Sequence, residues 1–153
     1  MDKFETLFAE YPCVLTDELV KKNTADILAR HTEENNTREV WMQCLNQIDL
    51  TTLNGDDTTE KVATMAQKVN DFDGHFPGVP NVAAMCVYPA LVETAREVLT
   101  EPIGIAAVAA GFPASQTFIE VKVAEAAMAV AAGATEIDIV ISIGKFLEGN
   151  YQE

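Results

Sequence analysis

Three residues of this sequence have side chains suited to acid–base or covalent chemistry and lie on, or just after, predicted strands: Asp49, Asp138 and Lys145. Two carboxylates at the carboxyl ends of parallel strands can exchange protons with a substrate or bind a divalent metal ion. Equally, Asp49 can cap a turn and Asp138 can form a structural ion pair. A desolvated lysine can form a Schiff base, but for Lys145 we expect a solvated loop cation.

Asp138 lies within the alternating segment 136–143, in which every second residue from Ile137 to Ile143 is isoleucine. This period of two, together with the β-branched residues, predicts a strand. Strands of parallel sheets are usually apolar on both faces, and an isolated buried charge is too costly to keep. We therefore expect Asp138 to point inward and to be paired, hydrogen-bonded or hydrated.

The cysteines and histidines do not predict a metal site. Cys13, Cys44 and Cys86 show neither CxxC pairing nor the spacing of metal ligands, and this indicates reduced thiols in a cytoplasmic protein. Cys86 lies on a predicted strand, where a small core residue is a more frequent role than a nucleophile. His75 stands alone in a loop rich in glycine and proline.

The elements that must position these residues are strand–helix units. Strands are predicted at residues 48–52, 82–87, 103–110 and 136–143, each followed by a helical pattern. Asp57 and Glu60 have capping-box spacing at the start of the first of these helices, and Gly133 is expected to end the third. The alternation predicts an α/β protein with a parallel sheet.

Residues 1–46 form a predicted helical extension, and residues 47–153 form the strand–helix domain. Thr16 is expected to cap a helix that ends near Arg30, followed by a polar turn at residues 31–36 and a second helix. We expect these helices to pack on the main domain.

Size and charge exclude several classes of protein. With 153 residues, of which 48% are hydrophobic, the chain is long enough for one domain with a core. A net charge of −14 disfavours nucleic acid and anionic membrane as partners. The amino-terminal residues lack an apolar leader segment, and no apolar run approaches membrane-spanning length.

Four strand–helix units are half of a (β/α)₈ barrel, which needs about 250 residues. Four parallel strands can instead form an open doubly wound sheet. In either arrangement the sheet has two edges with unpaired backbone groups.

Four segments resemble the deoxyribose-phosphate aldolase family in the order expected for its first four strands. They are Asp49–Asn54 (DLTTLN), Asn81–Pro89 (NVAAMCVYP), Gly111–Pro113 (GFP) and Gly133–Val140 (GATEIDIV). The resemblance extends from about residue 45 to residue 153.

The resemblance implies a class I aldolase on a (β/α)₈ TIM barrel. Such an enzyme reversibly cleaves 2-deoxyribose 5-phosphate to glyceraldehyde 3-phosphate and acetaldehyde through a lysine Schiff base, without a metal or an organic cofactor. Asp138 matches the acid that shuttles protons through a water molecule. Asp49, Thr51, Leu53 and Cys86 should line the substrate pocket.

The Schiff-base lysine of this family belongs to a later strand, so we expect the sequence to hold the first half of a barrel and to lack activity by itself. Its expected partners are the phosphorylated sugar, other copies in a homo-oligomer, or the other half of the barrel. Two alternatives remain: a non-catalytic half-barrel module that completes its sheet with a partner chain, and a metal-assisted lyase or hydrolase that uses Asp49 and Asp138.

Overall fold

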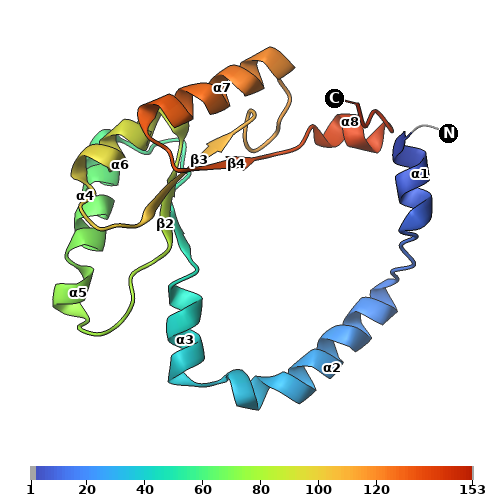
Figure 1. Cartoon of the computed structure of the whole chain (residues 1–153), viewed down its shortest axis with the longest axis horizontal. Coiled ribbons are helices and arrows are strands. Elements are labelled where there is room, and N and C mark those ends of the chain that lie inside the picture. Colours follow the sequence, from blue (N-terminus) through green and yellow to red (C-terminus); the bar gives the residue numbers. More distant parts are fainter. Residues whose placement is uncertain (1–2, 153) are drawn as a thin grey trace. The chain divides into compact units, whose positions relative to one another are not determined.

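The computed structural model describes residues 3–152 and divides the chain into two units, one that ends at Trp41 and one that begins at Met42. Figure 1 labels the helices and strands along the chain. Within the described residues, no helix is long and apolar enough to cross a membrane.

The first unit is helical. It contains α1 (Lys3–Glu10), α2 (Asp17–Asn35) and the start of α3 (Arg38–Leu45). The expected cap is confirmed, since the Thr16 hydroxyl accepts a hydrogen bond from the Leu19 amide at 3.2 Å. The turn expected at residues 31–36 is wrong: α2 continues to Asn35, because polar residues at its carboxyl end are no obstacle to an exposed helix. None of the three helices contains a buried residue, and their packing on the main domain stays a prediction.

The second unit consists of four strands with helices between them. In chain order its elements are β1 (Asp49–Thr51), α4 (Thr59–Asn70), α5 (Phe72–His75), β2 (Ala84–Val87), η1 (Pro89–Leu91), α6 (Val92–Val98), β3 (Gly104–Ala109), α7 (Ile119–Ala132), β4 (Glu136–Ile139) and α8 (Ile143–Leu147). The predicted α/β alternation is therefore confirmed.

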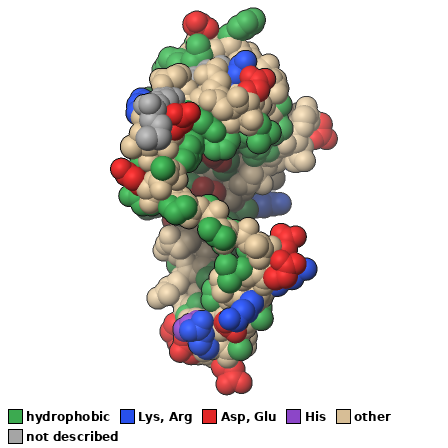
Figure 2. All heavy atoms as spheres, turned by 90° about the vertical axis from the view of Figure 1, so that its right-hand side faces the viewer, with side chains coloured by type: hydrophobic (Ala, Val, Ile, Leu, Met, Phe, Trp, Pro, Cys, Tyr) green, Lys and Arg blue, Asp and Glu red, His purple; other side chains and the backbone are tan. Residues whose placement is uncertain are grey.

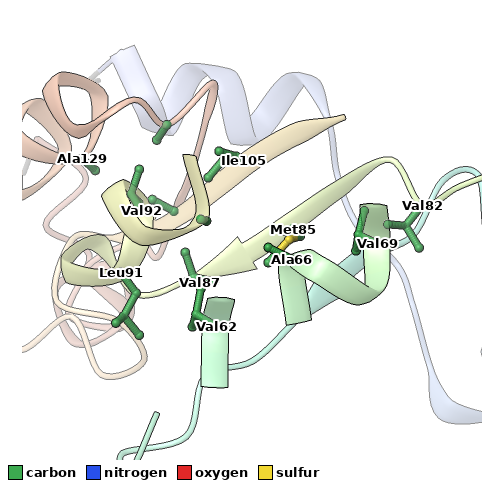
Figure 3. Close-up of a cluster of buried hydrophobic side chains, with 13 residues drawn as sticks. Val62, Ala66, Val69, Val82, Met85, Val87, Leu91, Val92, Ile105 and Ala129 are labelled. Atoms are coloured by element: carbon green, nitrogen blue, oxygen red, sulfur yellow. The ribbon is translucent and has the colours of Figure 1, made fainter. Parts of the chain in front are cut away.

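The strands form one parallel sheet in the order β1-β2-β3-β4. Helices α4, α6 and α7 cover one face of it (Figure 1). From this face Met85, Val87, Ile105 and Ala107 enter the main core, where they meet Val62, Ala66 and Val69 of α4 and Val92 of α6 (Figure 3). Burial of each methionine, valine or isoleucine side chain in this core contributes about 1.5–3 kcal/mol to the stability of the fold.

Gly133 ends α7 as expected. Its φ of 112° is left-handed, and its amide donates to the Ala129 and Val130 carbonyls. A Cβ added there would lie 2.3 Å from Cδ of Arg96, so a larger residue would strain the backbone and displace the Arg96 side chain.

Two local predictions are wrong. The fourth strand ends at Ile139 instead of residue 143, and α8 begins at Ile143. The reason is that β3, the only strand neighbour of β4 among the described residues, pairs with residues 136–139 and ends at Ala109. The cap of α4 is Thr58, whose hydroxyl accepts from the Lys61 amide at 3.2 Å, and not Asp57.

Asp57 instead holds the loop that follows β1. Its carboxylate, on a side chain that is 1% exposed, accepts hydrogen bonds from the Thr52 hydroxyl, the Asn54 amide and, at 2.5 Å, from Nζ of Lys61. The hydrogen bond from Lys61 is the main reason that the pKa of Asp57 falls from 3.8 to about 2, with smaller contributions from Asn54 and Thr52. The same pairing raises the pKa of Lys61.

Because the pKa of Asp57 is lower in the folded state, its ionised form stabilises the fold above about pH 3.8, and this contribution is lost as the pH falls through about 2. We expect Asp57→Asn to lower the urea midpoint of unfolding at pH 7 and to reduce the loss of stability between pH 4 and pH 2. Urea titrations at several pH values measure both effects.

Asp56→Asn is the matched control, since the Asp56 side chain is 90% exposed and lies 4.0 Å from Lys61. Equal urea midpoints for the Asp57 and Asp56 variants at every pH would contradict the role given to Asp57.

Candidate active site

The residues expected to do chemistry lie on the face of the sheet that the helices leave uncovered. Neighbouring residues in parallel register share a face, and successive residues of a strand alternate between faces. Leu50, Met85 and Ile105 are in register and pack toward the helices. Residues one position away, such as Thr51 and Cys86, therefore point to the opposite face.

The register arranges this uncovered face in rows. One row contains Thr51, Cys86, Ala106 and Glu136. The next row toward the carboxyl ends contains Val108 and Asp138, which are partners in register. Asp49 lies in the row nearer the amino ends, beside Ala84. The structure thus gathers Asp49, Thr51, Cys86 and Asp138 on one face, but only Asp138 of the two carboxylates lies toward the carboxyl ends.

Loops at the carboxyl ends of the strands cover the centre of this face. Leu53, Tyr88 and Phe112 pack on a small cluster of Cys86, Ala106 and Val108, which are 1–3% exposed. The Tyr88 hydroxyl donates to the Leu53 carbonyl at 3.3 Å, and this bond joins the loops after β1 and β2. Leu53 is therefore also at the site.

The loop after β3 is tied to its neighbours in a similar way. Oε2 of Glu125 accepts from the Gly111 amide at 2.9 Å, and the buried Ser115 hydroxyl lies 3.3 Å from the Val140 carbonyl, to which it donates. The Phe112–Pro113 peptide bond in this loop is cis. These bonds fix the segment that borders Asp138 at the end of β4.

The pKa of Cys86 reflects the burial and the negative charge on this face. Burial raises the pKa of its thiol, a hydrogen bond with Thr51 lowers it, and the negative charges of Asp138 and Asp49 raise it further. The two carboxylates are thus close enough to Cys86 to act on it. A buried thiol in a negative field is a poor nucleophile, and this favours a pocket-wall role for Cys86.

Asp138 itself is exposed on the uncovered face. Within residues 3–152 its carboxylate has neither an ion pair nor a hydrogen bond, and it is open to solvent. The strands of the sheet contain no lysine or arginine. No strand residue therefore offers the basic partner that was expected for Asp138.

The other candidates have ordinary roles in this structure. Lys145 lies on α8, its side chain is 47% exposed, and its Nζ is 3.4 Å from Oε2 of Glu148. Its exposure agrees with the expected solvated cation, but the residue lies on a helix and not in the expected loop. The loop expected for His75 is wrong, since this residue is the last one of the short helix α5. The described residues contain no cluster of three potential metal ligands.

Sequence reasoning missed Lys122. This α7 residue is 6% exposed, and its Nζ donates to the Ser142 hydroxyl at 2.5 Å. A lysine within an alanine-rich helix carries no sign of its burial, since long side chains usually extend to solvent. Its neighbours in sequence, Val121 and Val123, are apolar but exposed. A hydrophobic pattern would therefore bury the two valines and expose Lys122, which is the reverse of the structure.

Comparisons with known proteins identify the family of this chain. Residues 44–152 match the model of the DeoC/LacD family of aldolases, so the chain belongs to this family. It is similar to the deoxyribose-phosphate aldolase of Homo sapiens, with 36% identity in an alignment of length 146 that covers 87% of this chain and 46% of that protein.

Solved structures agree. An aldolase named QR15 matches with a TM-score of 0.61 at 26% identity, over 71% of this chain and 44% of that one. The deoxyribose phosphate aldolase of Aeropyrum pernix, described as tetrameric, matches with a TM-score of 0.57 at 24% identity, over 72% of this chain and 44% of that one.

The expected fold class is thereby confirmed: four parallel βα units of the TIM-barrel aldolase fold. The chain spans about half the length of the human and bovine relatives, which are covered to 46% each. The described half-barrel contains the face on which Asp138 lies.

The position of Cys86 leads to a test of the site's geometry. Cys13 and Cys44 are exposed, whereas Cys86 is buried and its pKa is raised. Iodoacetamide at pH 8 should therefore modify Cys13 and Cys44 first, and Cys86 at a rate at least about ten times lower. Peptide mass spectrometry over time measures the three rates.

In 8 M urea, where the burial of Cys86 is lost, the three rates should become similar. If Cys86 is modified as fast as Cys44 in the folded protein, the packing of Leu53, Tyr88 and Phe112 over it is wrong.

Proposed function

We propose that this chain supplies the proton-transferring half of a deoxyribose-phosphate aldolase site, which reversibly cleaves 2-deoxyribose 5-phosphate to glyceraldehyde 3-phosphate and acetaldehyde. The observation that carries the proposal is the position of Asp138 within the segment that matches the aldolase family. It lies on the uncovered face, toward the carboxyl ends of the strands, where TIM-barrel active sites are built.

In the proposed reaction a lysine from the other half of the barrel attacks C1 of the open-chain sugar and, with loss of water, forms an iminium ion. A base removes the proton of the C3 hydroxyl. The electrons of the C2–C3 bond move to the iminium nitrogen, which releases glyceraldehyde 3-phosphate and leaves an enamine. Protonation at C2 and hydrolysis then release acetaldehyde and the free lysine.

Asp138 is the proposed proton carrier of this cycle. Its carboxylate is open to solvent, so it can exchange protons with the substrate through a water molecule. As an anion it also favours the protonated states of a nearby lysine and iminium nitrogen.

The other residues of the face are proposed to form the pocket around the short sugar chain. Leu53 and Cys86 provide an apolar wall that excludes water, while the Thr51 hydroxyl provides a polar contact. Asp49 belongs to the deeper end of this pocket, and its charge acts at longer range, as its influence on Cys86 indicates. The proposed chemistry uses no metal or organic cofactor, and we expect a cytoplasmic, oligomeric enzyme.

The alternative function is a non-catalytic half-barrel that completes its sheet with a partner chain. It is favoured by the outer edges of β1 and β4, neither of which pairs with another strand in the described chain. Activity distinguishes the two functions, since both require docking and only the first requires Asp138.

The test is a chimera in which this chain replaces the matching part of the human aldolase. We expect the chimera to cleave 2-deoxyribose 5-phosphate and the 153-residue chain alone to be inactive. Asp138→Asn should lower kcat by about 10²–10⁴-fold, the usual contribution of a positioned acid–base group. A coupled assay of glyceraldehyde 3-phosphate release measures the rates.

Asp73→Asn, the same substitution at an exposed position of α5, controls for the loss of one negative charge and should retain the parent kcat. An Asp138→Asn chimera that folds and has the parent kcat would refute the role of Asp138. An unchanged midpoint of thermal unfolding shows that the variant folds.

A further inference from the structure

A carboxylate that the proposed chemistry does not use lies beside the candidate active site. Charged side chains of this protein are mostly exposed, and Figure 2 shows many of them at the molecular surface. The Asp57 side chain is an exception, because it is only 1% exposed. A carboxylate withdrawn from water is stable only where hydrogen bonds and a counterion replace its hydration. The groups that bind Asp57 therefore show which part of the fold depends on it.

The groups that bind the Asp57 carboxylate are all hydrogen-bond donors. The Thr52 hydroxyl lies 2.9 and 3.0 Å from its two oxygens, the Asn54 amide donates at 3.0 Å, and Nζ of Lys61 donates at 2.5 Å. The side-chain NH₂ of Asn54 is a further donor, at 3.4 Å. Both oxygens of a carboxylate accept hydrogen bonds, whereas a carboxamide has one oxygen and brings N–H donors of its own. Asparagine at position 57 would therefore set donor against donor.

These bonds fix both sequence neighbours of Leu53, the residue that packs over Cys86. Thr52 and Asn54 are each held by Asp57, and the Thr52 amide also donates to the Cys86 carbonyl at 3.0 Å. Leu53 itself packs on the buried cluster that contains Cys86. The position of Leu53 over Cys86 therefore depends on the two residues that Asp57 holds.

Lys61 connects this loop to the rigid part of the domain. It lies on α4, and the next residue, Val62, is buried in the main core on the other face of the sheet. Its ammonium is the charged partner of Asp57, and a charge-assisted hydrogen bond of this kind is about twice as strong as a neutral one. The pair therefore ties a loop on the uncovered face to a helix that the core holds in place.

We propose that Asp57 and Lys61 are positioning residues of the candidate active site: their ion pair keeps residues 52–57 closed over Cys86, so that Leu53 forms a wall of the substrate pocket. Both act through Leu53 rather than on the substrate. The inference rests on the proposed function for the identity of the pocket, but the position of the loop can be measured without catalysis. A role in stability alone would lower the free energy of unfolding and leave Cys86 covered in the folded protein.

The test compares the rate at which iodoacetamide modifies Cys86 in the folded 153-residue chain at pH 8, with Cys13 and Cys44 as internal references. Asp57→Asn and Lys61→Met should each raise the rate at Cys86 at least about tenfold, because the charge-assisted hydrogen bonds that keep the loop closed are lost. Lys61→Arg retains the positive charge and should keep the rate within about threefold of that of the unmodified chain.

Two variants serve as matched controls, and both should leave the rate at Cys86 within about twofold of the parent rate. Asp56→Asn removes one negative charge from an exposed side chain that lies 4.0 Å from Lys61. Val69→Ala removes buried packing of α4 on the opposite face of the sheet, and it shows whether lower stability alone exposes Cys86.

A rate at Cys86 that is unchanged in Asp57→Asn, or that rises equally in Val69→Ala, would overturn the proposal. Circular dichroism shows whether each variant is folded. Should Asp57→Asn not fold, the comparison of Lys61→Met with Lys61→Arg decides in its place.

The same substitution in the chimera separates the position of the loop from catalysis. In Asp57→Asn a displaced pocket wall should raise KM for 2-deoxyribose 5-phosphate about tenfold and change kcat less than about threefold, whereas Asp138→Asn should lower kcat. Faster modification of Cys86 with an unchanged KM would show that the loop does not border the substrate, and this would also overturn the proposal. An inactive parent chimera would instead refute the proposed function, while the rates at Cys86 still decide whether Asp57 holds the loop.

Discussion

The structure depends on the contrast between the two faces of one parallel sheet. One face is sealed by α4, α6 and α7, which together bury Met85 and Val87 in the main core. The other presents Asp49, Glu136 and Asp138 without a strand cation. Carboxylates on an uncovered face cost little while they are hydrated, but they become costly when the face is closed. Any closure of this sheet must therefore bring positive charge, and this requirement joins the fold to the proposed chemistry.

Much of the fold follows from local sequence rules. Gly133 ends α7 because its left-handed backbone favours glycine. The alternation of residues 136–139 correctly places Asp138 on the opposite face from Ile137. Errors occurred where tertiary contacts overrode the pattern. The alternation continues to Ile143, but β3 pairs with β4 only as far as Ile139. Asp57 has the spacing of a helix cap, yet its carboxylate accepts hydrogen bonds from Lys61 and Thr52 instead.

The gathering of Thr51, Cys86 and Asp138 on one face follows from strand register. In the sequence, only the resemblance to the aldolase family points to Thr51 and Cys86 as residues of one site with Asp138. Lys122 shows what the sequence leaves hidden. Its burial depends on how α7 rotates over the end of β4, where Ser142 meets its ammonium. No periodic pattern encodes such a contact, because a single lysine satisfies both a buried and an exposed position of a helix.

The central claim is that this chain carries the acid of the site and another part of the barrel carries the nucleophile. The direct measurement is reductive trapping of the chimera of this chain and the remaining human half with acetaldehyde and borohydride, followed by peptide mass spectrometry. The account predicts one ethylated lysine in the human half that is trapped much faster than any other, and no such lysine in this chain. Rapid, selective ethylation of Lys122 or Lys145 would contradict it.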